Sequence, residues 1–383
     1  MRYNTMRFRD GEDRVSMLGF GCMRFPKDSE GKIDENQAEA MIRQAMDAGV
    51  NYIDTAYPYH NGDSEPFLGR ILAKYPRNQF FLATKLPVWL VETPEDAERI
   101  FHEQLERLHV KYVDYYLFHA LNQERFDKLV RIGLIPWAKK LKKEGKIRHL
   151  GFSFHDSYEV FREILTYRQW DFCQIQYNYM DRDIQAGDRG RSLAEKMGIP
   201  LVIMEPVKGG TLAALPEEAE AVFKEQDPES SPSSWAIRWV GSQPDVKVIL
   251  SGMSSPEQVE ENLKTCSYFT CLSETEEQAV ERVSKVLRSR LKNGCTSCRY
   301  CMPCPFGVDI PGNFAIWNEH AMYGNEEKAE KAYQDKKKEK ASADLCRKCG
   351  KCEQVCPQRI QIRADLEQVS LQFGSGKDGT EEL

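Results

Sequence analysis

Two cysteine runs near the end of the chain constrain its fold more than any other feature. The first run precedes Pro305 and the second precedes Pro357, and together they comprise Cys295, Cys298, Cys301, Cys304, Cys346, Cys349, Cys352 and Cys356. The second run has the spacing C-x2-C-x2-C-x3-C-P, at which three thiolates wrap one corner of a cubane iron–sulfur cluster and the fourth ligates a second cluster. The spacing therefore predicts two [4Fe–4S] clusters held by a fold that brings the two runs together.

The exchange of the fourth ligand predicts how the cysteines divide between the clusters. We expect Cys356 to complete the site of Cys295, Cys298 and Cys301, and Cys304 to complete the site of the first three cysteines of the second run. The first run has two residues before its last cysteine where the second has three. The assignment of Cys304 therefore stays open on the sequence.

Two other uses of cysteine compete with the cluster interpretation. Structural zinc also takes four thiolates, but commonly as two separated C-x2-C pairs rather than as four cysteines in one run. A disulfide framework needs an oxidising compartment, and the first residues of the chain contain no apolar signal-peptide core. The sequence therefore favours iron–sulfur clusters in a reducing, cytoplasmic protein.

Length and charge restrict the partners of the chain. The 383 residues suffice for one large and one small domain, or for two to three ordinary domains. The 53 basic and 59 acidic residues give a net charge of −6, which argues against nucleic acid as a partner. No apolar stretch approaches the roughly 20 residues that span a bilayer. We expect a soluble protein that acts on small molecules.

Strand and helix patterns alternate from about residue 15 to 270. Eight short apolar runs predict strands at 18–22, 52–55, 80–86, 113–119, 148–153, 172–177, 201–204 and 246–250. Helical patterns separate them, and several end at glycine or begin at proline, as helix capping predicts. This arrangement predicts a TIM (β/α)8 barrel. A doubly wound open sheet is the rival, but no G-x-G-x-x-G motif follows the first strand.

The remainder of the chain predicts a separate module. Residues 273–291 have the pattern of a capped amphipathic helix that leads into Cys295. The stretch between Cys304 and Cys346 is long and helical in pattern, which favours an α-helical ferredoxin-like domain over the compact ferredoxin sandwich. We expect a barrel at 1–270, a connecting helix at 271–291, a 4Fe-4S ferredoxin-type domain at 292–365 and a flexible tail at 366–383.

The ends of several predicted strands carry polar residues in a recognisable order. The second strand ends in Asn-Tyr-Ile-Asp-Thr-Ala at 51–56, the third carries Ala-Thr-Lys at 83–85, and the fourth ends in Leu-Phe-His at 117–119. With Gly-Phe-Gly-Cys-Met-Arg at 19–24 and Glu-Gln-Val-Glu-Glu-Asn-Leu at 257–263, these motifs resemble the aldo-keto reductase family over about residues 1–270. With its cysteine module, the whole chain resembles the iron–sulfur-containing branch of that family.

The resemblance implies a catalytic tetrad of Asp54, Tyr59, Lys85 and His119. Chemistry explains the combination, because the phenol of tyrosine has a pKa near 10 and a neighbouring ammonium favours phenolate. Lys85 would supply that cation, while Asp54 would keep it charged and oriented. His119 would polarise a substrate carbonyl as Tyr59 delivers a proton. Tyr57 is the alternative phenol, although it does not have the family spacing.

The resemblance also implies contacts with a nicotinamide nucleotide. Ser153 and Gln174 match the positions that bind the nicotinamide carboxamide, and Met204 stands where an aromatic residue usually stacks on the ring. Lys208 and the glycines after it would meet the pyrophosphate. The last loop contains the remaining contacts, Gly252 and Gln258. Gln258 occupies a position where NADPH-specific members often have arginine, so NADH is plausible beside NADPH.

Three functions remain open on the sequence. In the first, the barrel reduces an aldehyde or ketone, or oxidises an alcohol, and the clusters shape the fold or an interface. In the second, the clusters relay electrons between the barrel and a ferredoxin-like redox partner. Such a route needs a converter between two-electron and one-electron transfer, and flavin is therefore not excluded although no flavin signature is found. In the third, the chain is a redox sensor or electron-transfer protein whose barrel only binds nucleotide.

Overall fold

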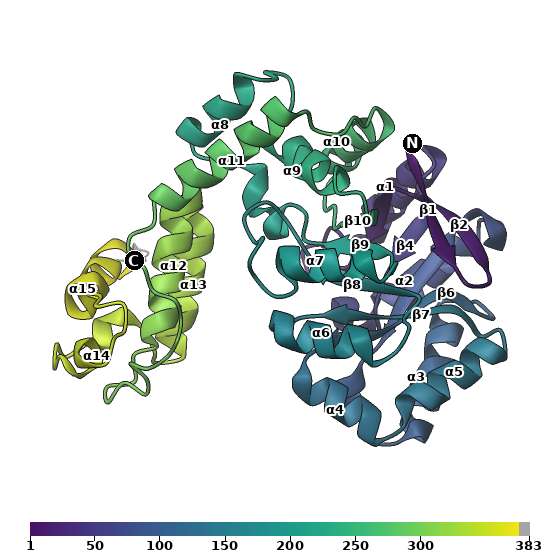
Figure 1. Cartoon of the computed structure of the whole chain (residues 1–383), viewed down its shortest axis with the longest axis horizontal. Helices are drawn as coiled ribbons and strands as arrows, with labels where there is room; N and C mark the ends of the chain where they lie inside the picture. The colour runs from purple at the N-terminus through teal and green to yellow at the C-terminus, as the bar shows by residue number, and fades with distance from the viewer. Residues whose placement is uncertain (375–383) are drawn as a thin grey trace, which may run out of the picture. The chain divides into compact units, whose positions relative to one another are not determined.

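Eight parallel strands close into a barrel in a computed structural model of the protein, which describes residues 1–374 (Figure 1). The order around the barrel is β10-β3-β4-β5-β6-β7-β8-β9, so each strand lies beside its neighbours in the chain. All eight strand predictions and the TIM-barrel fold are confirmed. The strands are β3 Leu18–Gly21, β4 Tyr52–Asp54, β5 Phe81–Leu86, β6 Val113–Leu121, β7 Ile147–Phe154, β8 Phe172–Gln176, β9 Leu201–Met204 and β10 Val246–Ser251.

The helices of the barrel follow from local capping chemistry. In α3 the hydroxyl of Thr93 accepts a hydrogen bond from the backbone of Asp96, whose carboxylate accepts one from Thr93, with Pro94 at the first helical position. Gly145, directly after α5 and Glu144, has the positive φ of 71° that often ends helices. These helices are α1 Glu35–Asp47, α2 Ser64–Leu72, α3 Pro94–Arg107, α4 Gln123–Arg131, α5 Leu134–Lys143, α6 Tyr158–Tyr167, α7 Gly187–Lys196, α9 Pro232–Gly241 and α10 Pro256–Ser267.

An N-terminal hairpin that the sequence analysis missed precedes the barrel. Strands β1 Tyr3–Phe8 and β2 Gly11–Ser16 pair antiparallel around a two-residue turn. Met6 and Val15 of this hairpin are buried in the same apolar cluster as residues from several barrel strands. The hairpin therefore covers the barrel at the end that contains the start of β6 and β7.

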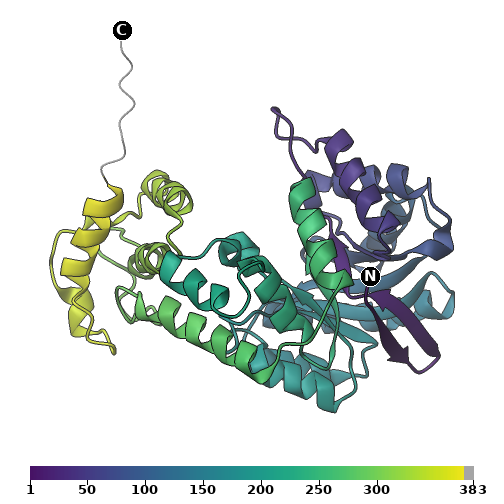
Figure 2. The same ribbon diagram turned by 90° about the horizontal axis from the view of Figure 1, so that it is seen from above.

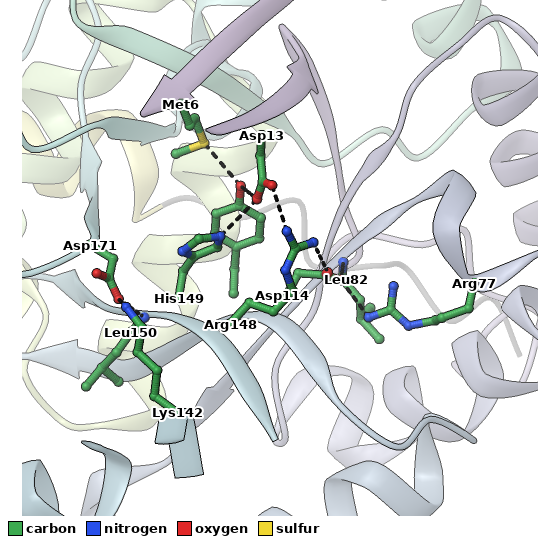
Figure 3. Close-up of polar contacts among 11 residues, drawn as sticks. Met6, Asp13, Arg77, Leu82, Asp114, Lys142, Arg148, His149, Leu150 and Asp171 are labelled. Atoms are coloured by element: carbon green, nitrogen blue, oxygen red, sulfur yellow. Dashed lines mark hydrogen bonds and ion pairs between the residues drawn. The ribbon is translucent and has the colours of Figure 1, made fainter. Parts of the chain in front are cut away.

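A buried carboxylate joins this hairpin to the barrel (Figure 3). Asp13 accepts a hydrogen bond of 2.8 Å from the hydroxyl of Tyr115, lies 2.9 Å from Nε2 of His149 and forms a 3.0 Å ion pair with Arg148. Arg148 also reaches Asp114 at 3.1 Å, so that the network spans the hairpin, β6 and β7. Burial opposes ionisation of Asp13, but the bonds from His149 and Tyr115 and the charge of Arg148 outweigh it and lower its pKa.

We expect Asp13→Asn to destabilise the barrel by about 2 kcal/mol at neutral pH, because hydrogen bonds to a buried charged group are lost. The pKa of Asp13 is lower in the folded state than in the unfolded state. Asp13 therefore makes its whole contribution to the free energy of unfolding above the unfolded pKa of about 3.9, and this contribution is lost as pH falls through the folded pKa. Urea unfolding at several pH values measures the difference. Asp10→Asn, in the exposed turn of the same hairpin, is the matched control. An equal loss of stability in both variants would contradict this role of Asp13.

The described residues divide into two compact units. The first unit comprises residues 1–210 and 233–277, and the second comprises residues 211–232 and the described residues from 278 onward. Residues 211–232 include α8 Glu217–Lys224, which lies within the range expected for the barrel but packs in the second unit. Ala219 and Phe223 are its buried residues, and exposed ion pairs lie at 3.3 Å between Arg290 and Glu218 and at 3.1 Å between Arg282 and Glu225. The helix expected at 271–291 is α11 Glu274–Ser289, with Ser273 as its capping residue.

The rest of the second unit is helical, as predicted for an α-helical ferredoxin-like domain (Figure 2). Its core includes Phe314, Tyr333 and Leu366, with six of the eight cysteines of the two runs packed against it. The flexible tail predicted from 366 is corrected for 366–373, because α15 continues to the buried side chain of Phe373. The rest of that prediction, 375–383, lies outside the described residues. The helices are α12 Ile310–Tyr323, α13 Glu326–Lys338, α14 Lys351–Gln354 and α15 Ile362–Phe373.

No helix among residues 1–374 combines the length and apolar character that crossing a bilayer requires.

Candidate active site and cysteine cavities

Three neighbouring strands bring the predicted tetrad together at their carboxyl ends. Asp54 ends β4, Lys85 lies near the end of β5, and His119 lies near the end of β6. The parallel register places Asp54 beside Ala83. Tyr59 begins the short 3-10 turn at Tyr59–Gly62 that follows β4. Because the carboxyl ends of parallel strands share one face of a barrel, residues far apart in the chain meet there.

Lys85 is the centre of this group. Its Nζ donates to Oδ1 of Asp54 at 2.6 Å, to the carbonyl oxygen of Thr55 at 2.7 Å and to the hydroxyl of Tyr59 at 3.3 Å. These three acceptors use all three N–H bonds of the ammonium. The side chain of Lys85 is fully buried. The arrangement fixes the ammonium against the phenol oxygen of Tyr59.

The charges of this buried group determine its protonation. Burial pulls the pKa of Lys85 down, but Asp54 and Tyr59 more than offset that effect and raise it. Burial raises the pKa of Tyr59, and the opposing charge of Lys85 offsets this only in part. The expected stabilisation of phenolate by Lys85 is therefore present but smaller than the effect of burial. Tyr59 is a protonated phenol at neutral pH, and it can donate a proton.

His119 lies against both Tyr59 and Trp89. Its ring is 5.9 Å from the ring of Tyr59, edge to face, and 5.1 Å from the ring of Trp89, measured between centroids. Burial lowers the pKa of His119 well below its ordinary value, and the nearby charges of Lys85 and Arg125 lower it further. His119 is therefore a neutral imidazole that offers one N–H to a hydrogen-bond acceptor.

The alternative phenol faces a different set of groups. The hydroxyl of Tyr57 donates to Glu103 at 2.9 Å, and the guanidinium of Arg107 lies 4.2 Å from the centroid of its ring. Both partners belong to α3, whereas Lys85 contacts Tyr59. The contacts therefore favour Tyr59 over Tyr57 as the phenol of the tetrad.

The predicted carboxamide contacts also lie at the carboxyl ends of strands. Ser153 of β7 accepts a hydrogen bond of 2.7 Å from the backbone of Ala120. Gln174 of β8 donates to Asp54 at 3.1 Å, and its Oε1 is a buried acceptor without a partner in the described part of the chain. Met204 is the half-buried last residue of β9. Of these three residues, Gln174 contacts the tetrad directly, through Asp54.

The predicted pyrophosphate contacts are partly occupied by protein groups. Nζ of Lys208 lies 2.6 Å and 2.7 Å from the two carboxylate oxygens of Asp181, so its charge is compensated. Gln258 caps the loop before α10, where it accepts from the backbone of Ser254 at 2.8 Å. A Cβ added to Gly252 would meet the side chain of Arg24 at 3.2 Å. Gly252 therefore leaves room for Arg24, which the sequence analysis did not single out.

The two cysteine runs surround two neighbouring cavities in the second unit. The larger, of about 200 Å³, has Cys304 in its wall together with Cys346, Cys349 and Cys352. The smaller, of about 20 Å³, has Cys356 in its wall together with the first three cysteines of the first run. Cys301 lines both cavities. The structure thus brings each fourth cysteine to the opposite run, in the arrangement predicted from the spacing.

The donor set of these cavities suits a cluster better than a single ion. Within residues 1–374, no three side chains of the kinds that ligate metals converge closely enough to hold one metal ion. Zinc would require sulfur atoms about 2.3 Å from a common point, whereas a cubane places several atoms between its thiolates. The backbone N–H of Lys348 already donates to the sulfur of Cys346 at 3.4 Å.

The smaller cavity, of about 20 Å³, would have to widen to admit a cubane.

Comparisons with known proteins agree with both parts of this description. The model of the Aldo/keto reductase family matches residues 17–285, and that of the 4Fe-4S dicluster domain matches residues 294–360. The NADH-specific methylglyoxal reductase of Escherichia coli is 28% identical over 276 residues, which cover 61% of this chain and 83% of that protein. The L-galactose dehydrogenase of Arabidopsis thaliana is 28% identical over 293 residues, which cover 70% and 89%.

Solved structures match the barrel in the same way. The holo form of an aldo-keto reductase from Bacillus halodurans is 26% identical with a TM-score of 0.63, over 74% of this chain and 96% of that one. An aldo/keto reductase from Klebsiella pneumoniae, solved with NADP and acetate, shares the fold at 23% identity and a TM-score of 0.60, over 73% and 95%. This chain therefore belongs to the aldo/keto reductase family of oxidoreductases, with a 4Fe-4S dicluster domain after the barrel.

Proposed function

We propose that the barrel catalyses the NAD(P)H-dependent reduction of an aldehyde or ketone, or the reverse oxidation of an alcohol. The observation that carries the proposal is the contact of Lys85 with both Asp54 and Tyr59, beside a neutral His119. A protonated phenol held by an ammonium is a proton donor, and a neutral imidazole is a hydrogen-bond donor. Both are needed where negative charge develops on a carbonyl oxygen during its reduction.

The residues at the ends of β7 and β8 fit a nicotinamide. Oε1 of Gln174 is a buried acceptor without a partner among the described residues, and it suits the N–H of a carboxamide. When bound, the reduced nicotinamide supplies a hydride to the carbonyl carbon. Ser153, Gln174 and Met204 would hold the ring, while Lys208, Gly252 and Gln258 would contact the rest of the nucleotide.

The tetrad residues supply the proton and stabilise the charge. Tyr59 donates its proton to the substrate oxygen, and Lys85 stabilises the phenolate that remains. Asp54 keeps Lys85 charged and fixes its position. His119 donates a hydrogen bond to the same substrate oxygen. We therefore propose it as a catalytic residue and not as a residue that holds the nucleotide.

The last loop favours NADH over NADPH. Gln258 is uncharged and caps the backbone of Ser254, so it offers no cation to a 2′-phosphate. The relative from Escherichia coli is described as NADH-specific, which supports the same preference. Comparison of kcat/KM for the two nucleotides with one aldehyde tests the preference, and equal values would remove the argument from Gln258.

In the second unit, we propose two [4Fe–4S] clusters in a domain at 292–365, preceded by a connecting helix at 271–291 and a barrel at 1–270. The eight cysteines that line the two cavities would be their ligands. The clusters supply one-electron transfer when bound, and the protein supplies the thiolates and the loops that space them. Their stability would be coupled to the folding of this unit.

We expect about eight irons and eight acid-labile sulfides per chain after anaerobic purification, with visible absorbance that bleaches on reduction by dithionite. The reason is the division of the eight cysteines between the walls of two cavities. Chemical analysis of iron, sulfide and zinc measures the content. Zinc at about two per chain without sulfide would contradict the cluster assignment.

A cationic rim favours electron exchange with an acidic partner. The larger cavity is lined by Arg347, Lys348, Lys351 and Arg363 and by no carboxylate. Lys348 pairs with Glu367 at 2.7 Å and Arg363 with Glu353 at 2.8 Å, so the excess positive charge of the rim comes from Arg347 and Lys351. Tyr300, Phe306 and Val355 line the same cavity and are exposed. Basic and apolar groups around a redox site suit docking of a ferredoxin-like carrier of opposite charge. We infer that the clusters relay single electrons through this rim, a route that needs a converter such as flavin between nicotinamide and the clusters.

The alternative is a redox sensor whose barrel only binds nucleotide. It would not need the protonated phenol or its contact with Lys85. Steady-state assays of nicotinamide oxidation with a panel of aldehydes, including methylglyoxal, separate the two functions. Nucleotide binding without turnover of any carbonyl compound would favour the sensor.

A further inference from the structure

One arginine beside the tetrad has no charged partner. Arg125 lies in the first turn of α4, and its Nη1 donates to the carbonyl oxygen of Ala120 at 2.7 Å. Its guanidinium carbon lies 4.7 Å from the centroid of the Trp89 ring. The same ring lies 5.1 Å from the ring of His119. Arg125 and Trp89 thus form a stacked pair next to the proposed catalytic imidazole.

The groups that act together with Arg125 on the pKa of His119 are Lys85 and His155. The positive charges of Arg125 and Lys85 both lower the pKa of His119. The charge of Arg125 also lowers the pKa of His155. The carboxylate of Glu205 opposes Arg125 at this position, because it raises the pKa of His155. Within residues 1–374, no carboxylate lies within ion-pair distance of Arg125, although neighbouring Lys128 pairs with Glu92 at 2.6 Å. A half-buried cation is left without a counterion here.

The chemistry of this cation selects its ligand. Guanidinium has five N–H donors in a plane, and the contact with Ala120 uses one of them. Stacking on Trp89 covers a face of the plane and leaves its edge for hydrogen bonds. A planar edge with paired N–H groups matches a carboxylate, which it can bind through two parallel hydrogen bonds.

We propose that Arg125 binds a carboxylate of the substrate, so that the physiological substrate is an oxo acid. This inference rests on the proposed carbonyl reduction. The reaction would be oxo acid plus NAD(P)H plus a proton, giving hydroxy acid plus NAD(P)⁺. The hydride forms the new C–H bond, and Tyr59 supplies the proton of the new O–H bond. Arg125 would position the substrate through its carboxylate while His119 binds the carbonyl oxygen.

The test compares oxo acids with neutral carbonyl compounds of similar size. The pairs are pyruvate with pyruvamide, and succinic semialdehyde with butanal. For at least one pair, we expect the wild type to favour the acid by about 100-fold in kcat/KM, because a charge-assisted pair of hydrogen bonds is worth a few kcal/mol. Arg125→Met should remove this preference by lowering kcat/KM for the acid, mainly through KM, far more than for the neutral compound. Arg125→Lys should restore part of it.

The control is Arg131→Met, at the exposed end of the same helix, which should keep the preference. If Arg125 only supports the backbone at Ala120, Arg125→Met will slow the acid and the neutral compound equally, and the inference is overturned. Equal kcat/KM for the acids and their neutral counterparts in the wild type would also overturn it.

A binding measurement separates this inference from the proposed function. Succinate should quench the fluorescence of Trp89 in the wild type and in Tyr59→Phe, but not in Arg125→Met, with Trp89→Phe identifying the signal. If no carbonyl compound is reduced and succinate still binds through Arg125, the proposed reaction fails and the carboxylate site stands. If aldehydes are reduced but succinate does not bind and no oxo acid is preferred, the carboxylate site fails and the reaction stands.

Discussion

Tyr59→Phe is expected to lower kcat for carbonyl reduction by about 1,000-fold or more, because general acid catalysis contributes roughly 100- to 10,000-fold. The change removes the hydroxyl that lies 3.3 Å from Nζ of Lys85 and leaves the ring in contact with His119. Binding of NADH should change little, since the phenol acts on the substrate oxygen in the transition state. Steady-state kinetics and a fluorescence titration with NADH measure the two effects.

The matched control is Tyr57→Phe, two residues earlier in the same loop. Its hydroxyl donates to Glu103 of α3, so its removal should leave kcat within about threefold of the wild type. The opposite result, an inactive Tyr57→Phe with an active Tyr59→Phe, would show that the tetrad is assigned to the wrong phenol.

Cys352→Ala is expected to remove the cluster of the larger cavity and leave about four of eight irons per chain. Cys352 lies in the wall of that cavity and packs against the apolar core of the second unit. Because binding of the cluster contributes to folding, this unit should lose several kcal/mol of stability. Iron analysis and thermal unfolding under anaerobic conditions measure both losses. Residues of the tetrad precede residue 120, so NADH oxidation by an aldehyde should persist.

Cys271→Ala serves as the control, since Cys271 is exposed and lines neither cavity. It should retain all of the iron. Loss of aldehyde reduction in Cys352→Ala, with nucleotide binding intact, would show instead that the clusters lie on the route of the electrons to the carbonyl. Unchanged iron content in Cys352→Ala would contradict the ligand assignment itself.

The barrel could be predicted because each strand is a short apolar run between capped helices. Leu201–Met204, for example, is a fully apolar strand that follows the glycine and proline after α7. The N-terminal hairpin could not be predicted in this way. Its second strand carries three charged residues in succession at 12–14, so no apolar run marks it. Asp13 is buried because Tyr115, His149 and Arg148 of distant strands hydrogen-bond to it. Such long-range pairing leaves no local pattern.

The candidate site could likewise be predicted only in part from the sequence. The family resemblance implied Asp54, Tyr59 and Lys85, and they approach one another because parallel strands bring their carboxyl ends to one face. The ligand spacing indicated how the cysteines divide between two cavities but left Cys304 open, and the structure places Cys304 in the wall of the larger cavity. The partnership of Lys208 with Asp181 was not predictable, nor was the stacking of Arg125 on Trp89. Both depend on the conformations of loops between strands, which no spacing in the chain encodes.

Hydride transfer from NADH to a carbonyl compound is tested most directly by anaerobic single-turnover kinetics with NADH deuterated at the transferred position. The iron-loaded protein would be mixed with this nucleotide and succinic semialdehyde while the absorbances of nicotinamide and of the clusters are followed separately. We expect oxidation of NADH with a primary isotope effect and formation of one hydroxy acid per nucleotide, and both should be absent in Tyr59→Phe. Bleaching of the clusters by NADH, with no alcohol or hydroxy acid formed from any carbonyl compound supplied, would contradict hydride transfer in the barrel.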